Sequence, residues 1–210
     1  HLRSDTRLCC LPYAHLLGVS KCGTTDLYAR LALHPLVLRT DNKGPHFWDE
    51  RHTFDWYLRI FADGANRLVH GVADSRSIML DASSNTFSYS RVGVRGWPRP
   101  SSSPTAVAAP APQLPHVLAY VHPALRSVLM LREPGERYYS AYHYYGRRYH
   151  LYSHFGALGA RAFDAMAQHE VRAFRSCVES CSARECAHKV FSTAEQLVKG
   201  LYSLALPDWT

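Results

Sequence analysis

The feature that most constrains this chain is a short apolar run that ends at a glycine and passes directly into a helical pattern. Residues 13–19 (Tyr-Ala-His-Leu-Leu-Gly-Val) are typical of a buried strand closed by a turn at Gly18. From Thr25 to Leu33 apolar residues recur at helical spacing, and Pro35 ends the pattern. A buried strand followed at once by a helix indicates an alternating architecture rather than an all-helical or all-strand one.

The same alternation continues along the chain. A continuous apolar run at 127–131 predicts a parallel strand that is covered on both faces. The other expected elements are strands at 37–38 and 77–80, helices at 54–61, 117–121 and 134–145, and a mostly helical region at 155–206. This order predicts an α/β fold with a parallel sheet flanked by helices.

Length and composition fit one globular domain. The chain has 210 residues, of which 47% are hydrophobic and 20% charged, enough for a core without disulfide support. Residues 97–115 hold six of the 12 prolines among Ser and Ala, and are predicted to be a loop inserted in that domain. No apolar run approaches the roughly 18 residues that cross a bilayer. Because the sequence begins with His1, we expect a processed product or a fragment.

The basic charge of the chain has two interpretations. The net charge is +7, and only four of the 24 basic residues are lysine. The arginine excess reflects either codon bias or an anionic partner such as a phosphate or an acidic glycan. No motif supports nucleic-acid binding. Where almost every cation is arginine, a retained lysine suggests that a compact ammonium group is wanted at that position.

The six cysteines do not follow a metal-binding pattern. No CxxC pair is present and the spacings match no zinc signature, so no metal site is expected. Cys177, Cys181 and Cys186 are close enough in sequence for one local disulfide, with Cys177–Cys186 the preferred pair. Buried free thiols are the equally weighted alternative.

Two segments have the residue types of a phosphate site. In residues 18–27 (Gly-Val-Ser-Lys-Cys-Gly-Thr-Thr-Asp-Leu), a tight turn with Lys21 precedes a helix N-terminus, where backbone N–H groups and hydroxyls can hold an anion. The order of a Walker A loop is absent. Arg132 leaves the end of a strand and Ser140 lies two helical turns later, a pair suited to a second phosphate. The alternatives are a plain connection with a solvated lysine, and an exposed arginine.

Together these segments resemble the nucleotide-binding elements of the sulfotransferases that use 3′-phosphoadenosine 5′-phosphosulfate (PAPS). The resemblance is closest to the Golgi carbohydrate sulfotransferases, and among them to the branch that sulfates N-acetylgalactosamine 4-sulfate at the 6-O position. It covers nearly the whole chain outside the proline-rich insert. The segments that carry it are 10–13, 21–27, 43–48, 81–83, 132–140, 200–202 and 208–209.

The resemblance implies a P-loop-NTPase-like fold, truncated in this sequence, and assigns roles on the donor side. Lys21 is the catalytic cation that balances charge as the sulfuryl group leaves. The implied donor-binding residues are Lys21, Cys22, Gly23, Thr24 and Thr25 around the 5′-phosphosulfate, and Arg132 and Ser140 at the 3′-phosphate. Sulfuryl transfer then depends on positioning, electrostatics and one base, and needs no metal.

The acceptor side departs from the family. Relatives carry a glutamate base where this chain has Gly44. His46 is the expected replacement base, with Lys43, His46 and Asp49 as acceptor-binding residues and Glu50 as another possible base. A relocated base, a non-catalytic nucleotide- or glycan-binding relative, and a sequence error all remain open.

The resemblance also implies where the protein works and on what. The expected acceptor is an acidic carbohydrate, such as a sulfated galactosaminoglycan. The expected location is the Golgi lumen, as part of a type II membrane protein whose anchor is not in this sequence. A nucleotide kinase is a poorer alternative, because neither a Walker A order nor an evident magnesium carboxylate is present.

Overall fold

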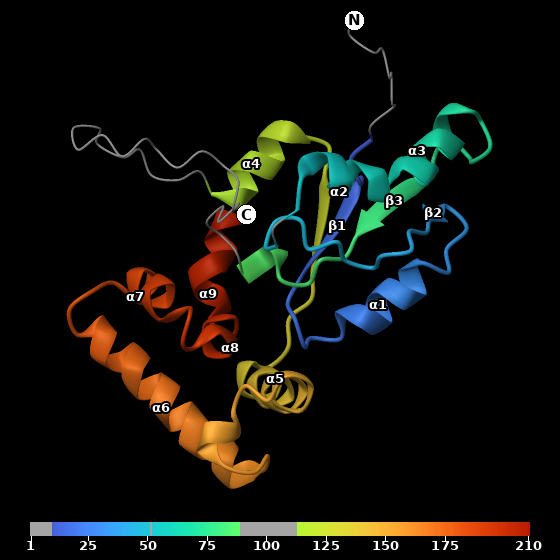
Figure 1. Ribbon diagram of the computed structural model, residues 1–210. Helices are drawn as coiled ribbons and strands as arrows, with labels where there is room; N and C mark the ends of the chain where they lie inside the picture. Colours follow the sequence, from blue (N-terminus) through green and yellow to red (C-terminus); the bar gives the residue numbers. More distant parts are fainter. Residues whose placement is uncertain (1–9, 51, 89–112) are drawn as a thin grey trace, which may run out of the picture. The chain divides into compact units, whose positions relative to one another are not determined.

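A computed structural model describes residues 10–50, 52–88 and 113–210 (Figure 1). Contacts divide the chain into two compact units, taken one at a time below. Unit 1 comprises residues 1–19 and 23–130, and unit 2 comprises residues 20–22 and 131–210. The expectation of one domain with an insert at 97–115 stays a prediction, and residues 97–112 of that insert lie outside the described residues.

Unit 1 is built on a parallel sheet. Strand β1 (Ala14–Gly18) lies between β3 (Ile78–Asp81) and β4 (Arg126–Leu129), and β2 (Val37–Leu38) pairs with β3, giving the order β2-β3-β1-β4. The predicted α/β class is therefore confirmed. Because all strands run the same way, the segments that follow β1, β3 and β4 leave from the same edge of the sheet, where ligands bind in open α/β folds.

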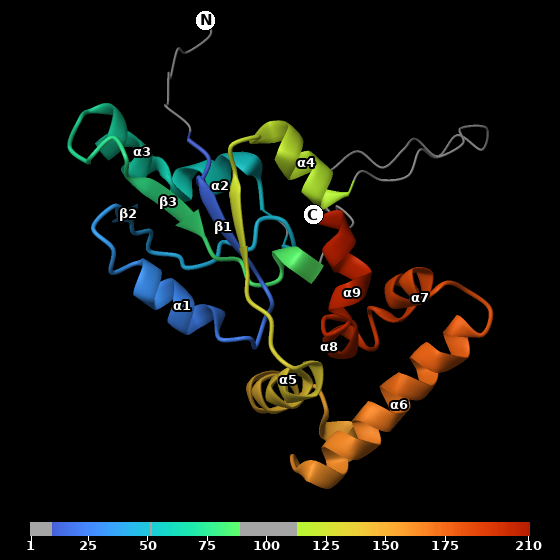
Figure 2. The ribbon, with the colours of Figure 1, turned by 180° about the vertical axis from the view of Figure 1, so that it is seen from behind.

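Helices cover both faces of this sheet (Figures 1 and 2). Helix α1 (Thr24–Leu31) packs Leu27 and Leu31 against Ala14 and Leu16 of β1. The strand period of two turns His15 to the opposite face, where it lines a cavity with residues of α2 (Phe54–Ile60) and α4 (Leu114–Val121). Helix α3 (Ala62–Val69) approaches the same face closely at a glycine. Helix α3 lies in a stretch for which no separate element was predicted.

Two sequence expectations in unit 1 need correction. The run at 127–131 was expected to be covered on both faces, but the strand spans 126–129 and its first three residues are exposed. It stands at the edge of the described sheet with β1 as its neighbour, and an apolar run does not reveal edge position. The helix expected at 117–121 begins at Leu114, because Pro115 suits a first helical turn.

Unit 2 is mainly helical, as predicted. Its helices are α5 (Pro134–Tyr149), α6 (Ala160–Val178), α7 (Ala183–Val190), α8 (Glu195–Val198) and α9 (Tyr202–Ala205). Short 3₁₀ turns are η1 (Thr86–Ser88) in unit 1, and η2 (Ser153–Phe155) and η3 (Leu206–Asp208) in unit 2. Tyr138 and Tyr142 of α5 pack with Met166 of α6 in the core. Part of the aromatic surface of α5 is thus turned inward.

Local sequence signals account for several helix ends in unit 2. The Glu133 carboxylate accepts the backbone N–H groups of Gly135 and Glu136 at the start of α5. Ser182 and Glu185 form a capping box at the start of α7. A disulfide joins Cys177 to Cys186, which confirms the preferred pairing over free thiols. No helix in the described ranges combines the length and apolarity needed to cross a membrane.

Candidate active site

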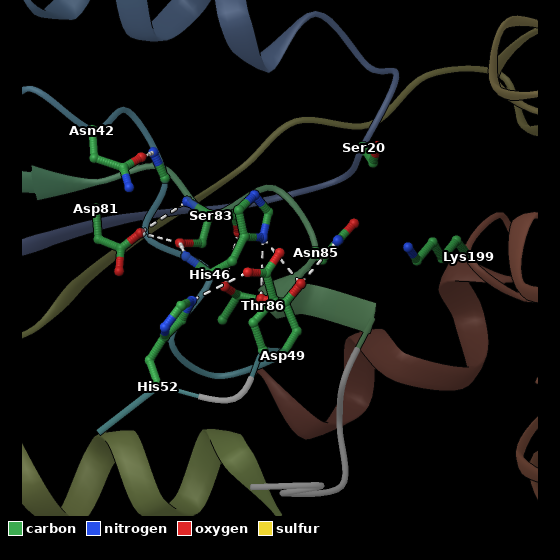
Figure 3. Close-up of polar contacts among 12 residues, drawn as sticks. Ser20, Asn42, His46, Asp49, His52, Asp81, Ser83, Asn85, Thr86 and Lys199 are labelled. Atoms are coloured by element: carbon green, nitrogen blue, oxygen red, sulfur yellow. Dashed lines mark hydrogen bonds and ion pairs between the residues drawn. The ribbon is translucent and has the colours of Figure 1, made fainter. Parts of the chain in front are cut away.

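In unit 1, the turn after β3 is fixed by a buried carboxylate. Asp81 is 1% exposed and accepts the Tyr57 hydroxyl at 2.8 Å. Its other oxygen accepts the backbone N–H of Ser83 at 2.8 Å and the Ser83 hydroxyl at 2.5 Å (Figure 3). A buried carboxylate with three donors is fully satisfied, so the turn is rigid.

That turn in turn holds the segment with the predicted acceptor-binding residues. The Ser83 hydroxyl oxygen accepts the backbone N–H of His46 at 2.9 Å. The side-chain amide of Asn85 donates to Asp49 at 2.9 Å (Figure 3). His46 and Asp49 are therefore positioned by two residues from a segment almost 40 positions away in sequence.

His46 and Asp49 form a close pair. The His46 Nδ1 atom lies 3.1 and 3.0 Å from the two carboxylate oxygens of Asp49, whose side chain is 3% exposed. Burial alone disfavours the charged ring, but the hydrogen bond and charge of Asp49, with the charges of Glu50 and Asp81, raise the pKa of His46. In the neutral ring Nδ1–H donates to Asp49, which leaves Nε2 as the unprotonated nitrogen.

Gly44 occupies a position with no room for a side chain. A Cβ atom there would lie 2.8 Å from the carbonyl oxygen of Ala82 and 3.0 Å from the Cα of Ser83. Both are backbone atoms of the rigid turn, so they cannot move aside as a side chain could. The packing around Gly44 therefore leaves no space for a glutamate side chain at this position.

Lys43 lies beside residues of the predicted donor loop. Its ammonium donates to the hydroxyl of Thr25 at 3.1 Å and approaches that of Thr24 at 3.4 Å. Both threonines are in the first turn of α1, directly after Gly23, whose φ of 90° suits glycine. The sequence-based assignment of Lys43 to the acceptor stays a prediction, and the contacts described here for its ammonium are with these two hydroxyls.

In unit 2, Ser20 and Lys21, from the turn after β1, contact residues of α5. The Lys21 ammonium is 3.6 Å from the ring centroid of Tyr144, a cation–π contact. The Ser20 hydroxyl is 3.2 Å from that of Tyr145, and buried Arg137 donates to the Ser20 carbonyl at 3.5 Å. Burial lowers the pKa of Lys21.

Three predicted donor-binding residues of unit 2 (Arg132, Ser140 and Lys21) either lie on one stripe of α5 or contact it. Arg132 donates to Glu136 at 3.1 Å. Glu136, Ser140 and Tyr144 recur every four residues and so share a helix face. Lys21 lies over Tyr144, at the far end of this stripe from Arg132. Unit 2 therefore lines up Arg132, Ser140 and Lys21 along one surface.

Tyr202 of α9 contacts both Arg132 and Cys22 of the turn after β1. The Tyr202 hydroxyl donates to the Arg132 carbonyl at 2.9 Å and lies 3.6 Å from the Cys22 sulfur. Burial, together with Cys22, raises the pKa of Tyr202 to about 12, so the hydroxyl stays protonated at neutral pH. Cys22 thus has a structural contact within unit 2 rather than an exposed thiol.

Both predicted catalytic residues have unusual backbone angles. Within the described ranges, three non-glycine residues have positive φ, and they are Lys21 (72°), His46 (54°) and His150 (53°). His150 caps the end of α5, where this conformation is common. Such strain costs on the order of 1–3 kcal/mol and clusters at functional sites.

The residues that position this site were not predicted from the sequence. Asp81, Ser83 and Tyr202 were noted only within the segments that carry the resemblance, and no positioning role was predicted for Asn85 or for Tyr144. Their partners lie far away in sequence, so no local spacing could have indicated them. A short Asp-x-Ser motif directly after a strand was the one available signal.

Comparison with solved structures defines the fold class. A sulfotransferase from Alicyclobacillus acidocaldarius aligns with 95% of this chain and 68% of its own, with a TM-score of 0.51 and 18% identity. The chain therefore has the sulfotransferase fold. No protein-family model matches the chain.

Curated relatives narrow this class. The chain is 28% identical over 229 aligned positions to carbohydrate sulfotransferase 15 of Homo sapiens, and equally to those of Rattus norvegicus and Mus musculus. The alignment covers 97% of this chain but only 38% of each relative. These matches show similarity to carbohydrate sulfotransferases, the family that the motif pair resembles.

Proposed function

We propose that this protein transfers a sulfuryl group from PAPS to a hydroxyl of a carbohydrate. The observation that carries the proposal is the stripe on α5, where Arg132, Ser140 and Lys21 lie in order along one surface. The similarity to carbohydrate sulfotransferases supports the same reaction class. Two anionic groups at the ends of one nucleotide match cations at the two ends of such a stripe.

On the donor side, cations and hydroxyl groups together bind the two phosphates and stabilise the leaving group. Arg132 and Ser140 bind the 3′-phosphate, while Gly23, Thr24 and Thr25 hold the 5′-phosphate at the N-terminus of α1. Lys21 balances the charge that develops on the bridging oxygen as the sulfur–oxygen bond breaks. Lys43, which already contacts the hydroxyl of Thr25, adds a second ammonium near the same phosphate.

On the acceptor side, His46 is the base. The acceptor oxygen attacks the sulfur in line with the bond that breaks, and its proton passes to Nε2 of His46. Asp49 holds the opposite nitrogen and stabilises the imidazolium that forms. The bisphosphate nucleotide then leaves with the electron pair of the broken bond.

The acceptor is an acidic carbohydrate, with sulfated galactosaminoglycans as its class. The support for this is the motif resemblance together with the arginine-rich composition. The proposed site of action is the Golgi lumen, where the resembling enzymes work.

Transfer of labelled sulfate from PAPS to a panel of glycosaminoglycans tests the proposal. Lys21→Ala should abolish transfer, and Arg132→Ala should weaken donor binding by at least about tenfold through loss of a charge-assisted contact. Lys189→Ala removes the same charge far along the chain and is the matched control. Unchanged transfer in Lys21→Ala would contradict the site assignment.

The Gly44 position makes a non-catalytic relative the alternative outcome. Calorimetry with 3′-phosphoadenosine 5′-phosphate separates the two. Nucleotide binding without sulfation of any glycan in the panel would favour the binding protein over the enzyme.

A further inference from the structure

Unit 2 contains a cluster of three sulfur atoms that the proposed reaction does not use. The disulfide links Cys177, in the last turn of α6, to Cys186 of α7. Cys181 lies in the short connection between these helices and is not in a disulfide. All three sulfur atoms lie within 4.8 Å of one another. A third thiol this close to a disulfide is within reach of exchange chemistry.

The surroundings of Cys181 favour its thiolate. The Lys189 ammonium lies 2.8 Å from the Cys181 sulfur, and the Ser180 hydroxyl is 3.9 Å away. The hydrogen bond from Lys189, followed by that from Ser180, lowers the pKa of Cys181, while the nearby charge of Glu185 opposes this shift. Cys181 is partly exposed, so reagents and solvent reach it. The thiolate, not the thiol, is the nucleophile in exchange.

The three cysteines differ in access. Cys186 is 0% exposed, whereas Cys177 and Cys181 are both partly exposed. Small electrophiles and small disulfides from solution therefore meet Cys181 first, because Cys177 is already in a bond and Cys186 is shielded. Lys189 supplies the cation that stabilises the Cys181 thiolate.

We propose that Cys181 is a reactive thiol that exchanges with the Cys177–Cys186 disulfide and accepts small thiol-directed reagents. In the exchange, the Cys181 thiolate forms a bond to one sulfur of the bridge as the Cys177–Cys186 bond breaks. The electron pair of that bond stays on the other sulfur, which leaves as a thiolate and takes a proton from water. One disulfide is present before and after, so no external oxidant or reductant is needed.

The exchange changes what the bridge connects. The Cys177–Cys186 bond ties α6 directly to α7. A bond from Cys181 to either of these cysteines ties the connecting segment to one helix and releases the direct link between the two. The cluster is thus a site where the covalent tether of the α6–α7 hairpin can be moved without net redox chemistry.

Disulfide mapping tests this on the oxidised full chain. The protein is held near neutral and at mildly alkaline pH, quenched in acid with excess N-ethylmaleimide, digested and analysed by mass spectrometry. We expect Cys177–Cys186 together with at least one pair that contains Cys181, whose share grows at the higher pH. In Cys181→Ser, Cys177–Cys186 should be the single pair in this cluster.

Labelling rates test the role of Lys189. At neutral pH, Cys181 should react with N-ethylmaleimide several-fold faster than Cys10, another partly exposed cysteine outside a disulfide. Lys189→Gln should slow Cys181 several-fold and leave Cys10 unchanged, and Lys189→Arg should restore most of the rate.

Two results would overturn the proposal. One is a wild-type chain that shows only Cys177–Cys186 at every pH after prolonged incubation. The other is a Cys181 that reacts no faster than Cys10 and does not respond to Lys189→Gln. Neither measurement involves PAPS or a glycan, so failure here leaves the proposed sulfotransferase function untouched.

Discussion

At the residue scale, the four lysines differ in the groups that their side chains contact. Each has a defined partner within its own unit. The pairs are Lys21 with the Tyr144 ring, Lys43 with Thr25, Lys189 with Cys181, and Lys199 with Glu195. Each partner accepts one compact cation: an aromatic face, a hydroxyl, a thiol and a single carboxylate oxygen. None of them requires the planar fork of arginine. The retention of lysine in an arginine-rich chain therefore has a structural reason at all four positions.

The His46–Asp49 pair predicts a specific pH dependence. As a base, His46 must be unprotonated, so activity should rise with pH through the pKa of His46, which Asp49 raises. Asp49→Asn should move this acidic limb to lower pH, because the neutral amide no longer favours the imidazolium. It should also reduce kcat by about tenfold or more, since the tautomer is no longer fixed.

Sulfate-transfer rates from acid to mildly alkaline pH check this prediction. His46→Gln should lose activity at all pH values. Glu50→Gln is the comparison variant: it removes a nearby charge but no hydrogen bond to His46, so it should move the acidic limb less than Asp49→Asn does. An acidic limb that stays in place in Asp49→Asn would contradict the assignment of His46 as the base.

The crowded position of Gly44 predicts intolerance to any side chain. Gly44→Ala should lower the free energy of unfolding by about 1–3 kcal/mol, because its Cβ meets backbone atoms of the turn after β3. Gly44→Glu, although it restores the family residue, should be at least as unstable and should not increase activity. Gly159→Ala, where a Cβ meets nothing closer than 4.0 Å, is the control.

Denaturant unfolding and transfer assays on the three variants check this. A Gly44→Glu variant that is stable and more active than the parent would show that the glycine is a simple loss, and would contradict the compensating role of His46.

At the element scale, α5 carries much of the candidate donor site. Its inner face supplies Tyr138 and Tyr142 to the core, while another stripe faces the loop with Lys21. A helix anchored on one face by burial can hold functional side chains on another with little loss of order. The amphipathic pattern that folds the helix therefore also aligns its binding residues.

The Tyr144 ring predicts an effect on donor affinity. Tyr144→Leu removes the cation–π contact that holds Lys21, and should weaken binding of 3′-phosphoadenosine 5′-phosphate by about two- to tenfold, as expected for a contact of about 0.5–1.4 kcal/mol. Tyr144→Phe keeps the ring face and should bind like the parent. Tyr149→Leu, on an exposed tyrosine of the same helix, is the control.

Calorimetry measures all three affinities under the same conditions. Tighter binding by Tyr144→Leu would show that the ring competes with the donor for Lys21 rather than positioning it.

At the scale of the whole molecule, the net charge of +7 is the dominant property. An acidic glycan should gain long-range attraction from this field, and salt should screen it within about 8 Å at physiological ionic strength. We therefore expect KM for a sulfated acceptor to rise several-fold from low to physiological salt. KM for its desulfated form should change much less.

Steady-state kinetics at a series of ionic strengths check this. Equal salt dependence for the two acceptors would indicate that the arginine excess has no part in acceptor binding and reflects codon usage instead.

The sequence alone determined the class of fold and indicated the segments of the candidate donor site. Strand, glycine turn and helix follow one another within residues 13–33, so periodicity and turn residues were enough to predict them. The eight-residue spacing of Arg132 and Ser140, and the close cysteines that form the Cys177–Cys186 bridge, are likewise local. Such short-range features can be predicted from the sequence because each depends only on residues that are close along the chain.

Only the tertiary structure decided how the predicted acceptor-binding residues are held. Ser83 fixes the backbone of His46, and Asn85 orients Asp49, across a gap in sequence that no periodic signal spans. The exposed, edge position of β4 and the crowding around Gly44 were equally invisible. The reason is physical: burial and hydrogen bonding depend on which distant segments come into contact. Those contacts exist only in the folded chain, so a single sequence does not show them.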